Sequence, residues 1–212
     1  MISNEVREQL QHIVRGAGLQ RSTDRSSTIR SLLVGSFGAD PTVKGQFESR
    51  AIVKERQNEF LKSYAVQSEI WLASLPSDSQ YLTRGGESKV FMDLDNRNVI
   101  KVNDGVYYAT WTEYLTSLVL HNLFFPNTAY SLVGFVEDGG NLNAVLRQPF
   151  IKGQQAKMED IRAILTFNGF ANTKRQDYFN KEFGLVLEDM HDENVISRQG
   201  VLFFIDTVFY VI

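Results

Sequence analysis

The spacing of apolar residues along the chain separates a helical first part from a strand-rich remainder. Residues 4–16 repeat apolar positions every three or four residues, which predicts a short amphipathic helix. Residues 20–45 are rich in Ser, Thr, Gly and charge, and we interpret part of this stretch as a loop or linker. Helical spacing returns between Val43 and Leu75, and Pro76 in the turn-like PSDS ends it.

After residue 78 the pattern changes to short strands with two helices among them. Apolar runs bounded by glycine or polar turns predict strands at 81–82, 89–94, 98–102, 130–137, 143–150, 195–196 and 201–205. Helical spacing predicts helices over about 106–124 and 157–168. This order predicts an α+β protein with a helical N-terminal extension over 1–78 and a compact domain over 79–212.

The composition narrows the classes of protein to which the chain can belong. With 43% apolar and 22% charged residues it fits neither a disordered nor a membrane-embedded protein. The absence of cysteine excludes disulfides, thiol nucleophiles and Cys-based zinc or iron–sulfur sites, and suits a reducing compartment. The charged N-terminus and the lack of a long apolar run predict neither a signal peptide nor a membrane span. We therefore expect a cytoplasmic protein with no membrane contact.

The charge balance argues against nucleic acid as a partner. The formal net charge is −3, so the chain lacks the broad positive field that attracts nucleic acid or anionic lipid. Four arginines between residues 15 and 30 form only a modest basic patch, and a solvated surface is the simpler interpretation of it.

The most informative polar residues lie in LEDMHDEN at 187–194 and shortly after it. Asn194 follows Asp189 by five residues, and Asp206 stands inside the strongly apolar run VLFFIDTVFYVI. A buried unpaired carboxylate is costly, so Asp206 needs a partner, and a metal ion is a good one. Phosphoryl-transfer sites use one carboxylate to orient the attacking hydroxyl, and an Asn with a second Asp to hold Mg²⁺. An acidic loop of this composition is otherwise an ordinary solvated turn.

A second group of candidate residues surrounds one lysine in a β-branched strand. Lys101 lies in the middle of VIKV, where a lone lysine is usually the charge of an edge strand. The preceding Gly85 and Gly86, however, would let a hairpin fold over phosphate groups. Glu113 follows Lys101 by twelve residues on a predicted helix, and its carboxylate can hold the ammonium group in place.

In this order and spacing the chain resembles the protein-kinase-like superfamily. Gly85 and Val90 match the middle glycine and the valine of a glycine-rich loop, and VIKV matches the strand-three lysine motif. The form Asp-x-His-x-x-Asn is similar to aminoglycoside and choline-type small-molecule kinases. The strings GGESKVF, NVIKVND, HNLFFPNTAY, VLRQPFI and FFIDT look like the serine/threonine/tyrosine kinase domain of polyvalent proteins, carried by phages and conjugative elements of bacteria such as the Bacteroides group.

This resemblance, which covers about 79–210, implies a reduced kinase-like fold with an antiparallel-sheet small lobe and a truncated large lobe, because only 134 residues follow residue 78. It implies ATP and Mg²⁺ as cofactors and an unidentified phosphate acceptor. It implies that Lys101 binds the α- and β-phosphates and that Glu113 holds Lys101 in place. It also implies that Gly85, Gly86 and Val90 close over the nucleotide, and that backbone groups around Gln148 and Phe150 contact the adenine. Asp189 would then orient the acceptor hydroxyl, and Asn194 and Asp206 would bind Mg²⁺.

The chain also departs from the family pattern, and the departures leave a second interpretation open. Thr83 and Ser88 replace the first and third glycines of the loop, the DFG motif reads Asp-Thr-Val, and Glu188 replaces the arginine of His-Arg-Asp. Added negative charge beside a triphosphate is unfavourable unless Mg²⁺ offsets it. The alternative to an active kinase is therefore a pseudokinase or partner-recognition module. The sequence leaves the oligomeric state and the role of the N-terminal helices open.

Overall fold

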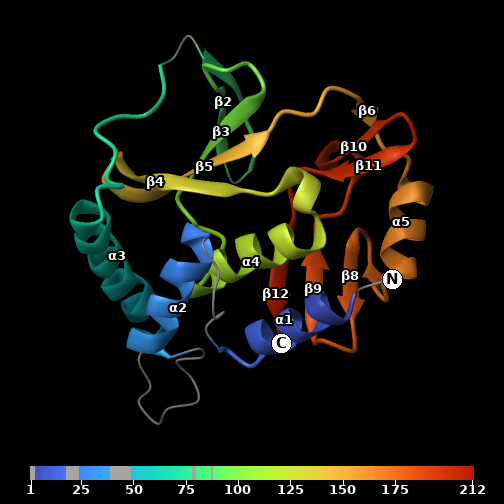
Figure 1. Ribbon diagram of the computed structural model, residues 1–212, viewed down its shortest axis with the longest axis horizontal. Coiled ribbons are helices and arrows are strands. Elements are labelled where there is room, and N and C mark those ends of the chain that lie inside the picture. Colours follow the sequence, from blue (N-terminus) through green and yellow to red (C-terminus); the bar gives the residue numbers. More distant parts are fainter. Residues whose placement is uncertain (1–2, 18–23, 39–48, 78–79, 87) are drawn as a thin grey trace.

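The computed structural model describes residues 3–17, 24–38, 49–77, 80–86 and 88–212. In these residues, α1 to α3 come first, and the strands of three antiparallel sheets follow with α4 and α5 among them, which is an α+β architecture, as the sequence predicted (Figure 1). The α-helices are α1 (Asn4–Val14), α2 (Arg25–Phe37), α3 (Arg50–Gln67), α4 (Trp111–Phe124) and α5 (Met158–Phe167). Short 3-10 helices lie at η2 (Pro126–Thr128) and η3 (Asp192–Asn194).

The first sheet carries the strand of the candidate lysine. Its strands are β1 (Tyr81–Arg84), β2 (Ser88–Met92), β3 (Asn98–Asn103), β4 (Ser131–Asp138) and β5 (Asn141–Pro149), in the spatial order β1-β2-β3-β5-β4. All five were predicted, with bounds that differ by at most two residues. Lys101 lies opposite Val90 on one side and Leu146 on the other, so it belongs to an interior strand rather than an edge strand.

Two smaller sheets hold the C-terminal part of the chain. One has the order β11-β10-β6, from β6 (Gln154–Gln155), β10 (Val195–Arg198) and β11 (Val201–Phe204). The other has the order β12-β9-β8-β7, from β7 (Ala171–Lys174), β8 (Asp177–Asn180), β9 (Leu185–Glu188) and β12 (Val208–Val211). Only β10 and β11 were predicted. All four residues of β7 are exposed, so this strand has no alternation of apolar and polar positions by which to detect it.

The stretch interpreted in part as a linker, 20–45, contains helix α2. The Asp24 side chain caps this helix by accepting the backbone N–H of Ser27. The helix buries Ile29 and Leu33, but it also buries Arg30, and buried polar residues hide the periodicity that indicates a helix. Residues 18–23 and 39–48 lie outside the described residues, as does the start of the helix expected from Val43.

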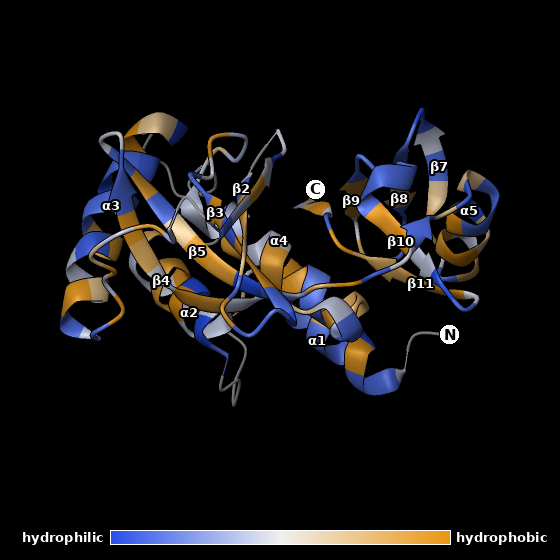
Figure 2. Cartoon of the chain, turned by 90° about the horizontal axis from the view of Figure 1, so that it is seen from above, coloured by the Kyte–Doolittle hydropathy of each residue, from blue (hydrophilic) through white to orange (hydrophobic). Residues whose placement is uncertain are grey.

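The N-terminal helices share two hydrophobic cores with the rest of the chain. One core joins α1, α4 and α5 with the sheet β12-β9-β8-β7, and the other joins α2, α3 and α4 with the first sheet. Figure 2 shows α2 and α3 beside the first sheet. In the same view α1 lies between these elements and α5. The boundary at residues 78 and 79 stays a prediction. No helix among the described residues has both the length and the hydropathy that a bilayer span requires.

Gly134 provides a test of how the segment after α3 is attached to the first sheet. The N–H of Phe135 donates to the Ile70 carbonyl at 2.9 Å, and the Leu72 N–H donates to the Phe135 carbonyl at 2.8 Å. A Cβ atom at Gly134 would overlap the Ile70 carbonyl oxygen. We expect Gly134→Ala to lower the free energy of unfolding by about 2 kcal/mol, because the backbone bridge has to move.

Urea denaturation measures this effect, and Gly35→Ala is the control. An added Cβ at Gly35 meets no atom within 4 Å, and Gly35 lies inside α2. Alanine is the better helix former by up to about 1 kcal/mol, so this variant should be as stable as the wild type or slightly more stable. Equal stability of Gly134→Ala and the wild type would contradict the tight approach.

Candidate functional site

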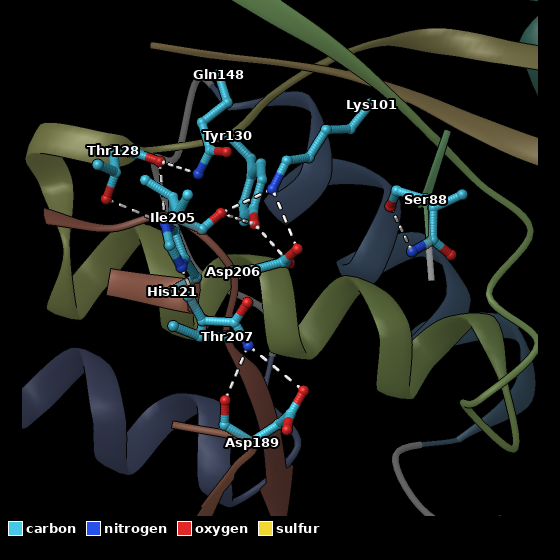
Figure 3. Close-up of polar contacts among 12 residues, drawn as sticks. Ser88, Lys101, His121, Thr128, Tyr130, Gln148, Asp189, Ile205, Asp206 and Thr207 are labelled. Atoms are coloured by element: carbon cyan, nitrogen blue, oxygen red, sulfur yellow. Dashed lines mark hydrogen bonds and ion pairs between the residues drawn. The ribbon is translucent and has the colours of Figure 1, made fainter. Parts of the chain in front are cut away.

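The structure brings Lys101 and Asp206 together from two motifs that are distant in the sequence. Only 7% of the Lys101 side chain is exposed. Its Nζ donates to the Ile205 carbonyl at 2.8 Å and lies 3.4 Å from Oδ2 of Asp206. The same Nζ lies 5.4 Å from the centre of the Tyr130 ring, within reach of a cation–π contact. Figure 3 shows the side chains of Lys101, Tyr130 and Asp206 directed toward one another.

Asp206 has a partner, as the sequence required, but the expectation that its carboxylate is buried within the apolar run is wrong. The apolar run divides into β11 and β12, which belong to different sheets, and Asp206 lies between them with 44% of its side chain exposed. Its Oδ1 accepts a long hydrogen bond of 3.4 Å from the Tyr130 hydroxyl. The carboxylate is therefore accessible from solvent and is paired with Lys101 at the same time.

The structure does not bring Glu113 to Lys101. Glu113 lies in the first turn of α4, where Thr110 caps the helix by accepting the Glu113 N–H at 3.1 Å. The Glu113 carboxylate reaches back past the N-cap residue Thr110 and accepts the Ala109 N–H at 3.0 Å. Its other oxygen lies 3.8 Å from a guanidinium nitrogen of Arg50 on α3. The carboxylate beside Lys101 is instead that of Asp206.

Asp189 and Asn194 are held together in the loop that follows β9. Asp189 has a φ of 61°, an uncommon conformation for a residue other than glycine. Nδ2 of Asn194 donates to the Asp189 carbonyl at 2.8 Å and lies 3.4 Å from the Asp189 carboxylate. The Asn194 carbonyl accepts the Ile205 N–H at 2.9 Å, which ties this loop to the segment of Asp206. Asp189, Asn194 and the segment of Asp206 are thus connected by hydrogen bonds.

The glycine turn lies at the end of the β1–β2 hairpin. The Gly85 N–H donates to the Ser88 carbonyl at 3.0 Å. An added Cβ at Gly85 or Gly86 would meet no atom within 4 Å, so packing within the described residues does not demand glycine at either position. Val90 pairs with Lys101 across the β2–β3 ladder. These positions agree with a hairpin that lies next to the lysine, while Glu87 of the turn lies outside the described residues.

The segment expected to meet an adenine connects the first sheet with β6. The Phe150 N–H donates to the Arg97 carbonyl at 2.9 Å, so this N–H is not free to bind a base. The side chain of Gln148 is buried, and its Nε2 donates to the Thr128 carbonyl at 2.8 Å. At Gly153 an added Cβ would overlap Ile196 and the Ser197 carbonyl, so the close approach of this segment to β10 requires glycine. The adenine contact itself stays a prediction.

Sequence reasoning missed a buried histidine that connects several of these elements. His121 on α4 is fully buried; its Nδ1 lies 2.7 Å from the Thr207 hydroxyl and its Nε2 lies 3.0 Å from the Thr128 carbonyl. Burial lowers the pKa of His121 to about 4, so the ring is neutral at neutral pH. A carbonyl oxygen can only accept, so Nε2 carries the hydrogen and Nδ1 accepts from Thr207. Its place in the string HNLFFPNTAY was the signal available in the sequence.

The buried His121 predicts a loss of stability in mild acid. In the unfolded chain the pKa of His121 returns to about 6.5, and it is about 4 in the folded chain. The unfolded state therefore binds more protons between these values, so the contribution of His121 is complete above about pH 6.5 and declines as the pH falls toward 4. Between pH 7 and pH 5 we expect a loss of about 2 kcal/mol from this residue.

Urea denaturation at the two pH values measures this loss. Because glutamine does not titrate, the stability of His121→Gln should depend less on pH than that of the wild type. His12 is exposed, and His12→Gln should keep the wild-type dependence. Identical pH dependence in the wild type and His121→Gln would show that the histidine is not held neutral.

The donor set fits Mg²⁺ bound together with phosphates. The described residues contain no group of three or more His, Cys, Asp or Glu side chains that could hold a metal ion. Mg²⁺ prefers hard oxygen ligands and is often bound by one or two carboxylates plus phosphate oxygens and waters. The accessible Asp206 carboxylate and the amide oxygen of Asn194 supply such a partial set. A cavity of about 960 Å³ between the N-terminal helices and β12 is lined by neither Lys101 nor Asp206.

Comparison with known proteins agrees with this arrangement. A family model described as the serine/threonine/tyrosine kinase found in polyvalent proteins matches residues 54–212. The match begins inside α3 and includes the first sheet, α4 and every strand of the two smaller sheets. A search of curated proteins found no match. Because the family model covers well over half of the 212 residues, the chain belongs to the family of serine/threonine/tyrosine kinases found in polyvalent proteins.

Proposed function

We propose that the protein is a phosphotransferase that uses ATP with Mg²⁺ and transfers the γ-phosphoryl group to a hydroxyl of an acceptor. The observation that carries this proposal is the meeting of Lys101 and Asp206 beside the loop that holds Asp189 and Asn194. Phosphoryl transfer depends on placing cationic and metal-binding groups around the phosphates. In this proposal the first sheet with α4 is the small lobe, and the two smaller sheets with α5 form a reduced large lobe.

Each polar residue then has a definite task. Lys101, which is buried and points out of the first sheet, would exchange its contact with Asp206 for the α- and β-phosphates. Asp206 and Asn194 would hold Mg²⁺, which when bound neutralises the phosphate charge. Asp189 would orient the acceptor hydroxyl and receive its proton, while the hydroxyl oxygen bonds to the γ-phosphorus and ADP leaves. Its exposed carboxylate is accessible to an acceptor.

Nucleotide binding is the first test of this assignment. Isothermal titration calorimetry of the wild type with ATP and Mg²⁺ should give measurable binding that weakens when Mg²⁺ is removed. Lys101→Met should weaken binding by about 10- to 100-fold, because a charge-assisted contact to phosphate is lost. The control is Lys89→Met, since Lys89 lies on the neighbouring β2 strand and pairs with Asp138 instead. Absence of Mg²⁺-dependent nucleotide binding in the wild type would overturn the proposal.

A second candidate is a nucleotide-binding module that does not catalyse transfer. The observation that favours it is the position of Glu113, which contacts Ala109 and Arg50 rather than Lys101. Burial raises the pKa of Glu188, and the negative charges of Asp177 and Asp189 nearby raise it further, so three carboxylates lie close together beside the loop. ATP binding without any release of ADP would favour this second candidate.

A further inference from the structure

The backbone of Asp206 is restrained by the contacts of the residues before and after it in the chain. On its C-terminal side, Thr207 is buried and its hydroxyl donates to Nδ1 of His121 at 2.7 Å. On its N-terminal side, the Ile205 carbonyl accepts from Lys101 at 2.8 Å and from the Tyr130 hydroxyl at 3.0 Å. These contacts restrain the backbone on both sides of a carboxylate that is itself partly exposed.

The contact between Thr207 and His121 belongs to a longer buried chain of hydrogen bonds. Nε2 of His121 donates to the Thr128 carbonyl at 3.0 Å, and Gln148 of β5 donates to the same carbonyl at 2.8 Å. These side chains are almost completely enclosed, so water cannot replace the Thr207 hydroxyl without reorganising the core. Figure 3 shows this chain passing from Gln148 through Thr128 and His121 to Thr207. It connects the first sheet and α4 with the residue next to Asp206.

Helix α4 also holds the strand that follows Asp206. The Phe209 N–H donates to the Ser117 hydroxyl at 2.9 Å, and Ser117 lies one turn before His121 on the same helix. The start of β12 is therefore attached to α4 at two points, Thr207 and Phe209. These contacts restrain the backbone of Asp206 and so the direction in which its side chain leaves the chain.

We propose that Thr207 and His121 are positioning residues that hold Asp206 in the orientation needed to bind Mg²⁺. This inference rests on the proposed function, because it concerns the same metal-binding carboxylate. Neither residue touches the metal in this view; the hydroxyl of Thr207 transmits the position of α4 to the backbone of Asp206. Removal of hydrogen bonds that support a metal ligand from the outer shell lowers metal affinity by about 10- to 100-fold.

The test compares three substitutions at one position. Thr207→Val keeps the shape and removes the hydroxyl, Thr207→Ser keeps the hydroxyl, and Thr207→Cys keeps a weaker donor. Thr116→Val is the matched control, because Thr116 is also buried on the inside of the protein and its hydroxyl contacts Arg30 and the Thr112 carbonyl, not the segment of Asp206. For each protein, ATP affinity is measured by calorimetry over a series of Mg²⁺ concentrations, and circular dichroism checks the fold.

We expect Thr207→Val to need about 10- to 100-fold more Mg²⁺ for half of its effect on ATP affinity, with unchanged binding of ATP in EDTA. Thr207→Ser and Thr116→Val should behave as the wild type, and Thr207→Cys should lie between. If Thr207→Val does not fold, Thr207→Cys carries the test.

Three outcomes would overturn the inference. An unchanged Mg²⁺ requirement in Thr207→Val and Thr207→Cys overturns it and leaves the proposed function intact. Equal weakening of ATP binding with and without Mg²⁺ indicates a purely structural role and overturns it as well. Absence of Mg²⁺-dependent binding in the wild type overturns both the inference and the proposed function.

Discussion

Replacement of Asp189 by asparagine is expected to lower the turnover number for phosphoryl transfer by about 10²- to 10⁴-fold, with little change in the affinity for ATP and Mg²⁺. Asparagine has the same shape but cannot accept the proton of the acceptor hydroxyl. The Asp189 side chain is 66% exposed, and its carboxylate lies 3.4 Å from Asn194 and 3.5 Å from His191, so the substitution should not disturb the fold. Release of ADP and transfer of labelled γ-phosphate measure the turnover.

The control for this experiment is Glu193→Gln in the same acidic loop. Glu193 is exposed, and its substitution removes one negative charge without touching the proposed proton acceptor. It should retain the turnover of the wild type. Equal losses in both variants would assign the effect to the charge of the loop, and wild-type turnover in Asp189→Asn would show that Asp189 has no part in the proton transfer.

Substitution of Arg30 by methionine should lower the free energy of unfolding by about 2–4 kcal/mol. The guanidinium group is almost completely buried, and it donates to the Thr116 hydroxyl at 2.8 Å, the Ala17 carbonyl at 2.9 Å and the Ile13 carbonyl at 3.0 Å. Burial also lowers the pKa of Arg30 to about 10. Methionine fills much of the volume but removes all three of these hydrogen bonds, which is the source of the cost.

Chemical denaturation at neutral pH provides the measurement, with Arg162→Met as the control. Arg162 is an exposed arginine on α5, and its substitution should change the free energy by no more than about 0.5 kcal/mol. A loss at Arg30 of the expected size would establish that α1 and α2 are held to α4 as integral parts of the fold. Similar small effects at both positions would mean that the first two helices contribute little to stability.

Local sequence signals predicted the parts of the fold in which neighbouring residues determine the structure. The five strands of the first sheet and both later helices have apolar periodicity in their own residues, so they were predicted, with errors of at most two residues at the strand ends and of about five residues at the start of α4. The same reasoning identified Lys101, because a single charge in a β-branched strand is conspicuous. Strand β7 was missed because all four of its residues are exposed, and helix α2 was missed because it buries Arg30 among its apolar residues.

The arrangement of the candidate site depends on contacts that sequence periodicity does not contain. The pairing of His121 with Thr207 joins residues 86 positions apart, and neither residue is unusual in its local context. The division of the apolar run at Asp206 arises because its two halves pair with strands of different sheets. Glu113 lies in the first turn of α4, where its carboxylate accepts the backbone N–H of Ala109 just before the helix and does not extend to Lys101.

The participation of α4 in both hydrophobic cores has a consequence for the cooperativity of folding. Val119 and Leu120 lie in one core, while Trp111, Tyr114 and Leu115 lie in the other, all within fourteen consecutive residues of one helix. Loss of this helix would remove side chains from both cores at once, so we expect the two cores to unfold in one cooperative transition. Lys101 lies on a strand of the first sheet, and Asp206 lies between the two smaller sheets. The ion pair between them therefore exists only when both parts of the chain are folded.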